Sequence, residues 1–223
     1  MSFRFSMVAS GSSGGGPLTF TFVGSAETEG STSSIDIGGS ISIASGDFAV
    51  WCGYQWDGSA TSLYDALPTG WSSAAATNVT SGSYAIDLGY KILTGSEGVT
   101  AQRGAANLTR RNYVFVWRPS KAITSVTVND AYVQLTNANP ASNTINGSSA
   151  GAGPVIQVGF NAAGGATVNP WTNSNFDSTY ATSTDAMKVG TRYDAGIPGV
   201  DCVHDMADEG AGNGTAGCYF TFT

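Results

Sequence analysis

The sequence predicts an all-β protein, built as a two-sheet antiparallel β-sandwich or a jelly roll. Several segments alternate apolar and polar residues with the two-residue period of a half-buried strand. Charged residues make up only 11% of the chain. Ser, Thr, Asn and Gly take their place, and these residues suit strands and tight turns better than helices. Gly-rich turn sequences separate the apolar segments, as is typical of sandwiches.

The length of 223 residues is within the range of one large β domain. The expected boundary lies at Pro17, with an N-terminal arm and linker over residues 1–16 and a single sandwich over 17–223. In the arm, Phe3, Phe5 and Met7 alternate with other residues, and the Gly/Ser linker Gly11–Gly16 follows. An apolar strand on such a tether can pair with its own sheet or with the sheet edge of a neighbour. The sequence leaves both possibilities open.

The clearest strands are Phe48–Trp56 and the half-buried Tyr84–Ile92. Trp51 makes the first of them apolar on both faces, which predicts a central position in its sheet. Further strands are expected at Leu18–Val23, Asn112–Trp117, Ile123–Val128, Tyr132–Leu135, Val155–Phe160, Met187–Tyr193 and Cys218–Phe222, with shorter ones at Ile35–Ile37 and Ile41–Ile43. Asn129–Asp130 is expected to form a turn between two strands, and Tyr64–Leu67 a short helical turn before Pro68.

The net charge of −7 argues against nucleic acid as a partner, because phosphate binding needs a basic face. One stretch is locally basic, since it contains five of the nine basic residues and no acid. These five are Arg103, Arg110, Arg111, Arg118 and Lys121. We interpret them as a solvated or subunit-contact patch.

No apolar stretch is long enough to span a membrane, and the N-terminal residues lack the layout of a signal peptide. We therefore expect synthesis in a cytoplasm and no membrane partner. The three cysteines are expected to be free buried thiols, and Cys202–Cys218 is the one plausible bridge.

A cluster of metal-binding residue types lies near the C-terminus, over Asp201–Glu209. It contains the single His204, but neither zinc-site spacing nor the alternating ligands of a calcium loop. We interpret it as a solvated acidic loop without a metal. His204 is also the only base for a Ser-His-Asp site, and no nucleophile elbow or nucleotide-binding loop is present. The sequence therefore predicts neither an enzyme nor a cofactor.

Trp71 and Trp171 lie in loop-like sequence, after Thr69–Gly70 and Pro170. Exposed rings of this kind stack on sugars in carbohydrate-binding sandwiches. The alternative, which we favour, is that both rings cap the ends of the core.

Four short motifs follow one another in order along the chain: Ser45–Gly46–Asp47–Phe48–Ala49–Val50, Leu67–Pro68–Thr69–Gly70–Trp71, Leu88–Gly89–Tyr90–Lys91–Ile92 and Phe115–Val116–Trp117–Arg118–Pro119. The set resembles a class of all-β structural proteins of tailed phages, over about Leu18 to Phe160. Gly46–Asp47 is expected to turn into the strand at Phe48, and Pro68 with Gly70 to form a tight turn that presents Trp71 to the core. The Phe3–Gly16 arm and the Asp201–Glu209 loop depart from the pattern.

The resemblance implies a virion β-sandwich without enzymatic activity and carries over no catalytic residue. A capsid decoration or cement protein ranks first, with a major capsid protein as its partner and a homo-oligomer as its expected form. A tail accessory or fibre-tip adhesin that touches a host surface glycan ranks second. A carbohydrate-binding module, outside phage structure, ranks third.

Overall fold

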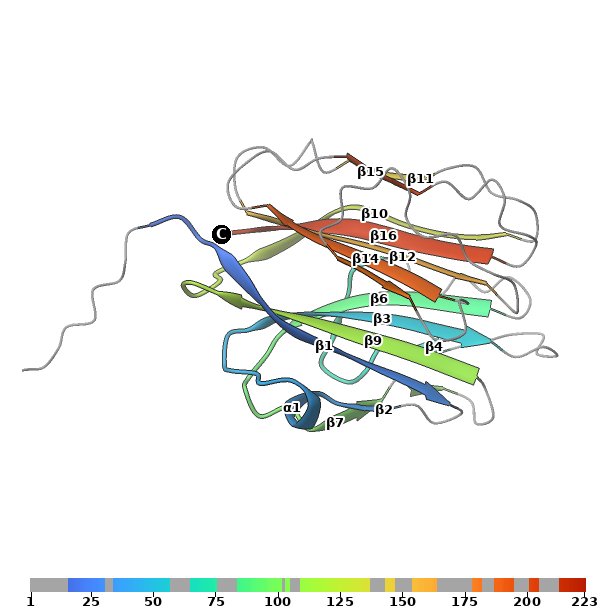
Figure 1. Ribbon diagram of the computed structural model, residues 1–223, viewed down its shortest axis with the longest axis horizontal. Coiled ribbons are helices and arrows are strands. Elements are labelled where there is room, and N and C mark those ends of the chain that lie inside the picture. The colour runs from blue at the N-terminus through green and yellow to red at the C-terminus, as the bar shows by residue number, and fades with distance from the viewer. Residues whose placement is uncertain are drawn as a thin grey trace, which may run out of the picture.

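The computed structural model describes residues 16–30, 34–56, 65–75, 84–101, 103–104, 109–136, 143–146, 154–163, 178–181, 187–194, 201–204 and 213–223. Two five-stranded antiparallel sheets pack face to face, as Figure 1 shows. The first sheet has the strand order β1 (Phe20–Gly30), β9 (Thr109–Pro119), β3 (Phe48–Trp56), β6 (Tyr84–Ile92) and β5 (Ser72–Ser73). The second has the order β10 (Val126–Thr136), β16 (Asn213–Phe222), β12 (Val155–Ala163), β14 (Met187–Asp194) and β13 (Ser178–Ala181).

Three two-stranded ladders complete the described strands. They pair β2 (Ser34–Asp36) with β7 (Val99–Ala101), β4 (Asp65–Ala66) with β8 (Arg103–Gly104), and β11 (Asn143–Asn146) with β15 (Asp201–His204). Each large sheet comes from one half of the chain, and the connection at residues 120–125 crosses from the first sheet to the second. The prediction of an all-β, two-sheet antiparallel sandwich is confirmed.

The main core lies between the two sheets. Phe48 of β3 contacts Phe220 and Phe222 of β16, with ring centroids 5.1 and 4.9 Å apart. Around them every second residue of β3, β6 and β9 points inward, as the two-residue period requires. Burial of this apolar face against the second sheet is the main source of stability for the sandwich.

A second core covers the opposite face of the first sheet. Trp51 and Val114 pack there against Ile35, Ile37 and Ile41, which come from the layer of β2, α1 (Ile37–Ser40) and the residues that follow (Figure 1). β3 is the third of five strands, so the predicted central position of the Trp51 strand is confirmed.

The half-buried character predicted for Tyr84–Ile92 is wrong in the middle of the strand, although Ile86 and Leu88 face the main core as expected. Asp87, on its polar face, is only 1% exposed, and Asn112 of β9, on the other side of Gly53, is also buried. The alternation reports which residues are apolar, and it cannot reveal a further layer of chain over the polar face.

The segment around α1 corrects a second prediction. Ile41–Ile43 is not a strand, and Ile37 begins α1 instead of ending a strand at Ile35–Ile37. Asp36 caps this short helix by accepting a hydrogen bond of 2.9 Å from the amide of Gly39. Ile41 and Ile43 alternate because both reach the second core, without any ladder partner.

Two turn predictions also fail. Asn129–Asp130 does not separate two strands, because β10 runs through it with a register shift between Asn129 and Tyr132. Asp130 takes a φ of 49° at this irregularity, so the turn signal marks a bulge within one strand. The helical turn predicted at Tyr64–Leu67 is contradicted where the chain is described, because Asp65–Ala66 is β4.

Two cysteines are free and fully buried in the main core, Cys52 from the first sheet and Cys218 from the second. Burial raises the pKa of both thiols, so both stay protonated. The bridge that the sequence allowed between Cys202 and Cys218 is not formed.

Candidate functional site

Asp47 and Arg118 hold one end of the first sheet together. Asp47 is 1% exposed, and its carboxylate accepts two hydrogen bonds from the guanidinium of Arg118, both 2.9 Å long. The same carboxylate accepts the amide of Ala44 at 2.7 Å, and Arg118 also donates to the carbonyl of Ser42 at 2.9 Å. These contacts fix residues 42–47 to the end of β9, and Gly46 turns the chain into β3 with a φ of 92°, as predicted.

A second turn joins the remaining two sequence motifs. The amide of Trp71 donates to the carbonyl of Pro68 at 3.1 Å, and Gly70 has a φ of 85°, so the predicted tight turn is present. Leu67, just before it, lies so close to Gly89 of β6 that a Cβ there would approach the Leu67 methyl carbon at 2.7 Å. The four motifs therefore contact one another in two pairs within the first sheet, the first motif with the fourth through Asp47 and Arg118, and the second with the third through Leu67 and Gly89.

The ring of Trp71 lies edge-on to Trp51, with centroids 5.6 Å apart, and is partly buried in the second core. Trp71 thus covers the outer face of the first sheet at β3. Its partner in the prediction, Trp171, lies outside the described residues.

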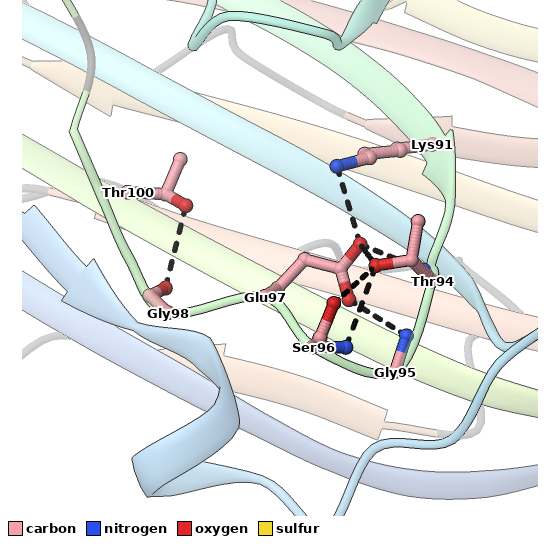
Figure 2. Close-up of polar contacts among 7 residues, drawn as sticks. All are labelled: Lys91, Thr94, Gly95, Ser96, Glu97, Gly98 and Thr100. Carbon is pink, nitrogen blue, oxygen red and sulfur yellow. Dashed lines mark hydrogen bonds and ion pairs between the residues drawn. The ribbon is translucent and has the colours of Figure 1, made fainter.

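The loop after β6 is fixed by Glu97, which Figure 2 shows at the centre of a polar network. Its carboxylate accepts the amide and hydroxyl of Thr94 at 2.7 and 3.0 Å, the amide of Gly95 at 3.0 Å and the Lys91 ammonium at 3.2 Å. Partial burial raises the pKa of Glu97, but the hydrogen bonds from Thr94 and Lys91 outweigh it and hold the pKa at about 2. At neutral pH the Glu97 carboxylate is ionised, and its hydrogen bonds stabilise this loop.

The loops of residues 42–47 and 93–97 also bond to each other. The amide of Leu93 donates to the carbonyl of Asp47 at 2.7 Å, and the amide of Gly46 donates to the carbonyl of Leu93 at 2.8 Å. These hydrogen bonds fix the two loops to each other at this end of the sandwich.

The five predicted patch residues do not form one surface. Arg111 is buried, on the same face of β9 as Tyr113, whereas Arg118 is engaged with Asp47 on the other face. Lys121 follows β9 and donates to the carbonyl of Gly16 at 3.2 Å. The backbones of Arg103 and Arg110 lie in β8 and β9. The structure thus brings Arg118 and Lys121 to one end of β9 and places Arg111 in the interior.

The sequence did not reveal the long edge strand of the first sheet. β1 spans 11 residues, well past the predicted end at Val23, and pairs with β9 on one side. None of the described strands pairs with its other side, which we call the β1 edge. Phe22 on this strand is 42% exposed while its ring contacts Trp117 at 5.7 Å. The polar second half of β1, with Glu27 and Glu29, hid its length from the apolar pattern.

The chain enters the sandwich directly beside this edge. The amide of Thr19 donates to the Ser120 hydroxyl at 3.0 Å, the amide of Ser120 donates to the carbonyl of Thr19 at 2.8 Å, and Leu18 is buried in the main core. The arm residues Phe3, Phe5 and Met7 precede this anchor and lie outside the described residues.

The acidic stretch Asp201–Glu209 is described only in part. Asp201, Cys202 and His204 belong to β15, while Asp205, Asp208 and Glu209 lie outside the described residues. In the described part of the chain, no group of three or more His, Cys, Asp or Glu residues could hold a metal ion. No helix within the described ranges is long and apolar enough to cross a membrane.

No protein-family model, curated protein or solved structure matches this chain. The features with a capacity for binding are therefore physical ones: an edge strand whose main-chain groups can pair with another strand, an exposed Phe22 on it, and a rigid set of turns beside it.

Proposed function

We propose that this protein is a non-enzymatic structural component of a tailed-phage virion. Its most specific form is a capsid decoration or cement protein that binds the outer surface of the head and stabilises it. Its partners are the major capsid protein and further copies of the same chain, as a homo-oligomer.

The observation that carries the proposal is the β1 edge next to the arm. An edge strand of 11 residues begins just after a sequence that joins an apolar alternation to a Gly/Ser linker. The chain thereby offers both halves of a strand-pairing contact. Such a contact depends on shape and main-chain hydrogen bonds more than on charge, in keeping with a charged fraction of 11%.

The turns at the same end support this function. Asp47 with Arg118, and Glu97 with Lys91, hold two surface loops by charged hydrogen bonds. A clamp between capsid subunits needs a surface that keeps its shape, because each side chain or loop ordered on binding costs affinity.

A tail accessory or fibre-tip protein that binds a host glycan is the second candidate. Trp71 favours it, since its ring is only partly covered and lies against Trp51. A carbohydrate-binding module is the third and would use the same ring.

The deciding experiment is immunogold electron microscopy with an antibody against this protein, on particles released from cells that express its genome. We expect gold on the heads. Gold on tails would favour the second candidate, and an absence of labelled particles would overturn the virion proposal. Quenching of tryptophan fluorescence by host polysaccharide, without particle labelling, would favour the carbohydrate-binding module.

A further inference from the structure

We infer that the chain is an internal duplication, in which residues 20–119 and 126–222 are two copies of one structural unit. The β11–β15 ladder then covers the second sheet as the β2–β7 ladder covers the first. The inference goes beyond the proposed function, because it concerns how the chain is built and what covers its second half.

The two large sheets have the same topology. Each half of the chain contributes five strands, and when these are counted along the chain, their order across both sheets is first, fifth, second, fourth, third. In the first sheet this order is β1, β9, β3, β6 and β5, and in the second it is β10, β16, β12, β14 and β13. Short, uncrossed connections would allow several other orders, so the agreement favours two copies of one unit.

The smaller ladders repeat as well. β2 and β11 each come between the first and second strands of their sheets, and β7 and β15 each come between the fourth and fifth. In each half these two added strands pair with each other in antiparallel fashion. β2 contacts β1 and β9, and β11 contacts their counterparts β10 and β16. Figure 1 shows the two ladders on opposite outer sides of the sandwich, each next to its own sheet.

The registers of the central strands also agree. In each central strand an aliphatic residue pairs with a tyrosine on one side and a phenylalanine on the other. The two rows are Tyr90–Val50–Phe115 and Tyr193–Ile156–Phe220. Three residues further along each central strand is a glycine, Gly53 in β3 and Gly159 in β12. Such matches are few, and no repeat is evident from the sequence alone.

The outer faces of the two sheets are buried at corresponding positions. In this register Trp51 corresponds to Gln157, and Val114, which pairs with Trp51, corresponds to Tyr219, which pairs with Gln157. All four residues are buried. Gln157 points away from the main core, because its neighbours Ile156 and Val158 face that core. The second sheet therefore has a covered outer face like the first, and β11–β15 is the ladder on that side.

The register of the ladders gives Ile145 the position of Ile35. The last residue of β2 pairs with the first of β7, and the last residue of β11 pairs with the first of β15. One position earlier, β2 has Ile35 and β11 has Ile145. Ile35 is 1% exposed and packs in the second core. The loops that lead into β7 and β15 also have the same length, residues 93–98 and 195–200. Ile145 is therefore the apolar contact between β11 and the sheet beneath it.

Paired substitutions in the full chain test this correspondence. Ile145→Ala and Ile35→Ala should each lower the melting temperature by at least about 4 °C, because each removes apolar burial beneath a ladder. The matched controls are Val99→Ala and Asp201→Ala, which change the first residues of β7 and β15. Val99 is 70% exposed, so both controls should shift the melting temperature by less than about 2 °C.

Ile145→Val is the milder variant for the case in which Ile145→Ala does not fold. It should lower the melting temperature by about 1–5 °C, in the same direction as Ile35→Val. An Ile145→Ala protein that melts within about 2 °C of wild type would overturn the inference. So would an Asp201→Ala protein that loses as much stability as Ile145→Ala, because the corresponding position in the first half is exposed.

Discussion

Arg118 donates two hydrogen bonds of 2.9 Å to Asp47, from Nε to Oδ1 and from Nη2 to Oδ2. The two residues are far apart in sequence, and their contact joins the start of β3 to the end of β9. The acid is buried while the guanidinium is partly exposed, with side-chain exposures of 1% and 46%. The bridge therefore keeps a buried carboxylate satisfied, and its loss should be felt mainly at Asp47.

Asp47→Ala is expected to lower the free energy of unfolding by about 2–4 kcal/mol, because it removes charged hydrogen bonds to Arg118 and to the amide of Ala44. Urea denaturation measures the change. Arg118→Lys is the graded comparison, since a single ammonium cannot make the two-point contact, and it should cost less than Asp47→Ala. Equal stability of Asp47→Ala and wild type would refute a structural role for the bridge.

Glu97 makes the stability of the protein depend on pH. Its folded pKa is about 2, below the ordinary value of 4.5, so its contribution is fully present above about pH 5 and is lost as the pH falls toward 2. Glu97→Gln should destabilise the protein by roughly 1–2 kcal/mol at pH 7, after allowance for solvent screening. The difference between wild type and Glu97→Gln should shrink between pH 5 and pH 2 in thermal melts. A difference that stays constant over this range would contradict the assignment.

Gly95 is required by both its backbone and its neighbours. Its φ of 85° is in the left-handed region, and a Cβ there would lie 2.6 Å from the amide nitrogen of Ser45. Gly95→Ala should therefore cost about 2–4 kcal/mol, from backbone strain and displacement of the loop before β3. Gly98→Ala is the matched control, because a Cβ at Gly98 meets nothing within 4 Å. It should change stability by less than about 0.5 kcal/mol.

Trp71 separates the capping role from sugar binding. Trp71→Ala should reduce the free energy of unfolding by about 2 kcal/mol, because the ring is partly buried against Trp51. Titration with host polysaccharide should leave the tryptophan fluorescence of the wild type unchanged. Quenching that disappears in Trp71→Ala would show instead that the exposed part of the ring binds sugar.

The sequence predicted the strands of the main core because their environment repeats every two residues. In β3, Phe48 faces the second sheet and Trp51 faces the outer layer, and the alternation had indicated a central strand with apolar residues on both sides. Period and composition report local surroundings. They do not reveal which chain segment supplies the cover, and so the layer of α1 and β2 over Trp51 was not predicted.

The same limit explains the errors. Ile41 and Ile43 pack in the second core without belonging to a strand. Asp130 lies at a bulge within β10 instead of ending a strand. The pairing of Asp47 with Arg118 joins residues 71 positions apart, and no local pattern indicates it. The β1 edge was missed for a related reason, because an edge strand with a polar half lacks the continuous alternation of an interior strand.

Deletion of residues 1–15 separates the arm's contribution to association from any contribution to the domain. The truncation keeps Gly16, whose carbonyl binds Lys121, and the buried Leu18, so the anchor of the chain stays intact. In a dilute, monomeric sample the melting temperature should change by less than about 2 °C, whereas binding to particles should fall sharply.

If Phe3, Phe5 and Met7 packed on their own sandwich, the loss of their burial would cost several kcal/mol, at about 1.5–3 kcal/mol for each side chain. That loss would lower the melting temperature by more than about 6 °C. A truncated protein that melts this far below the full chain, or that still decorates particles normally, would refute the role of the arm in assembly. The loops around Asp47 and Glu97 would then remain as the candidate contact surface.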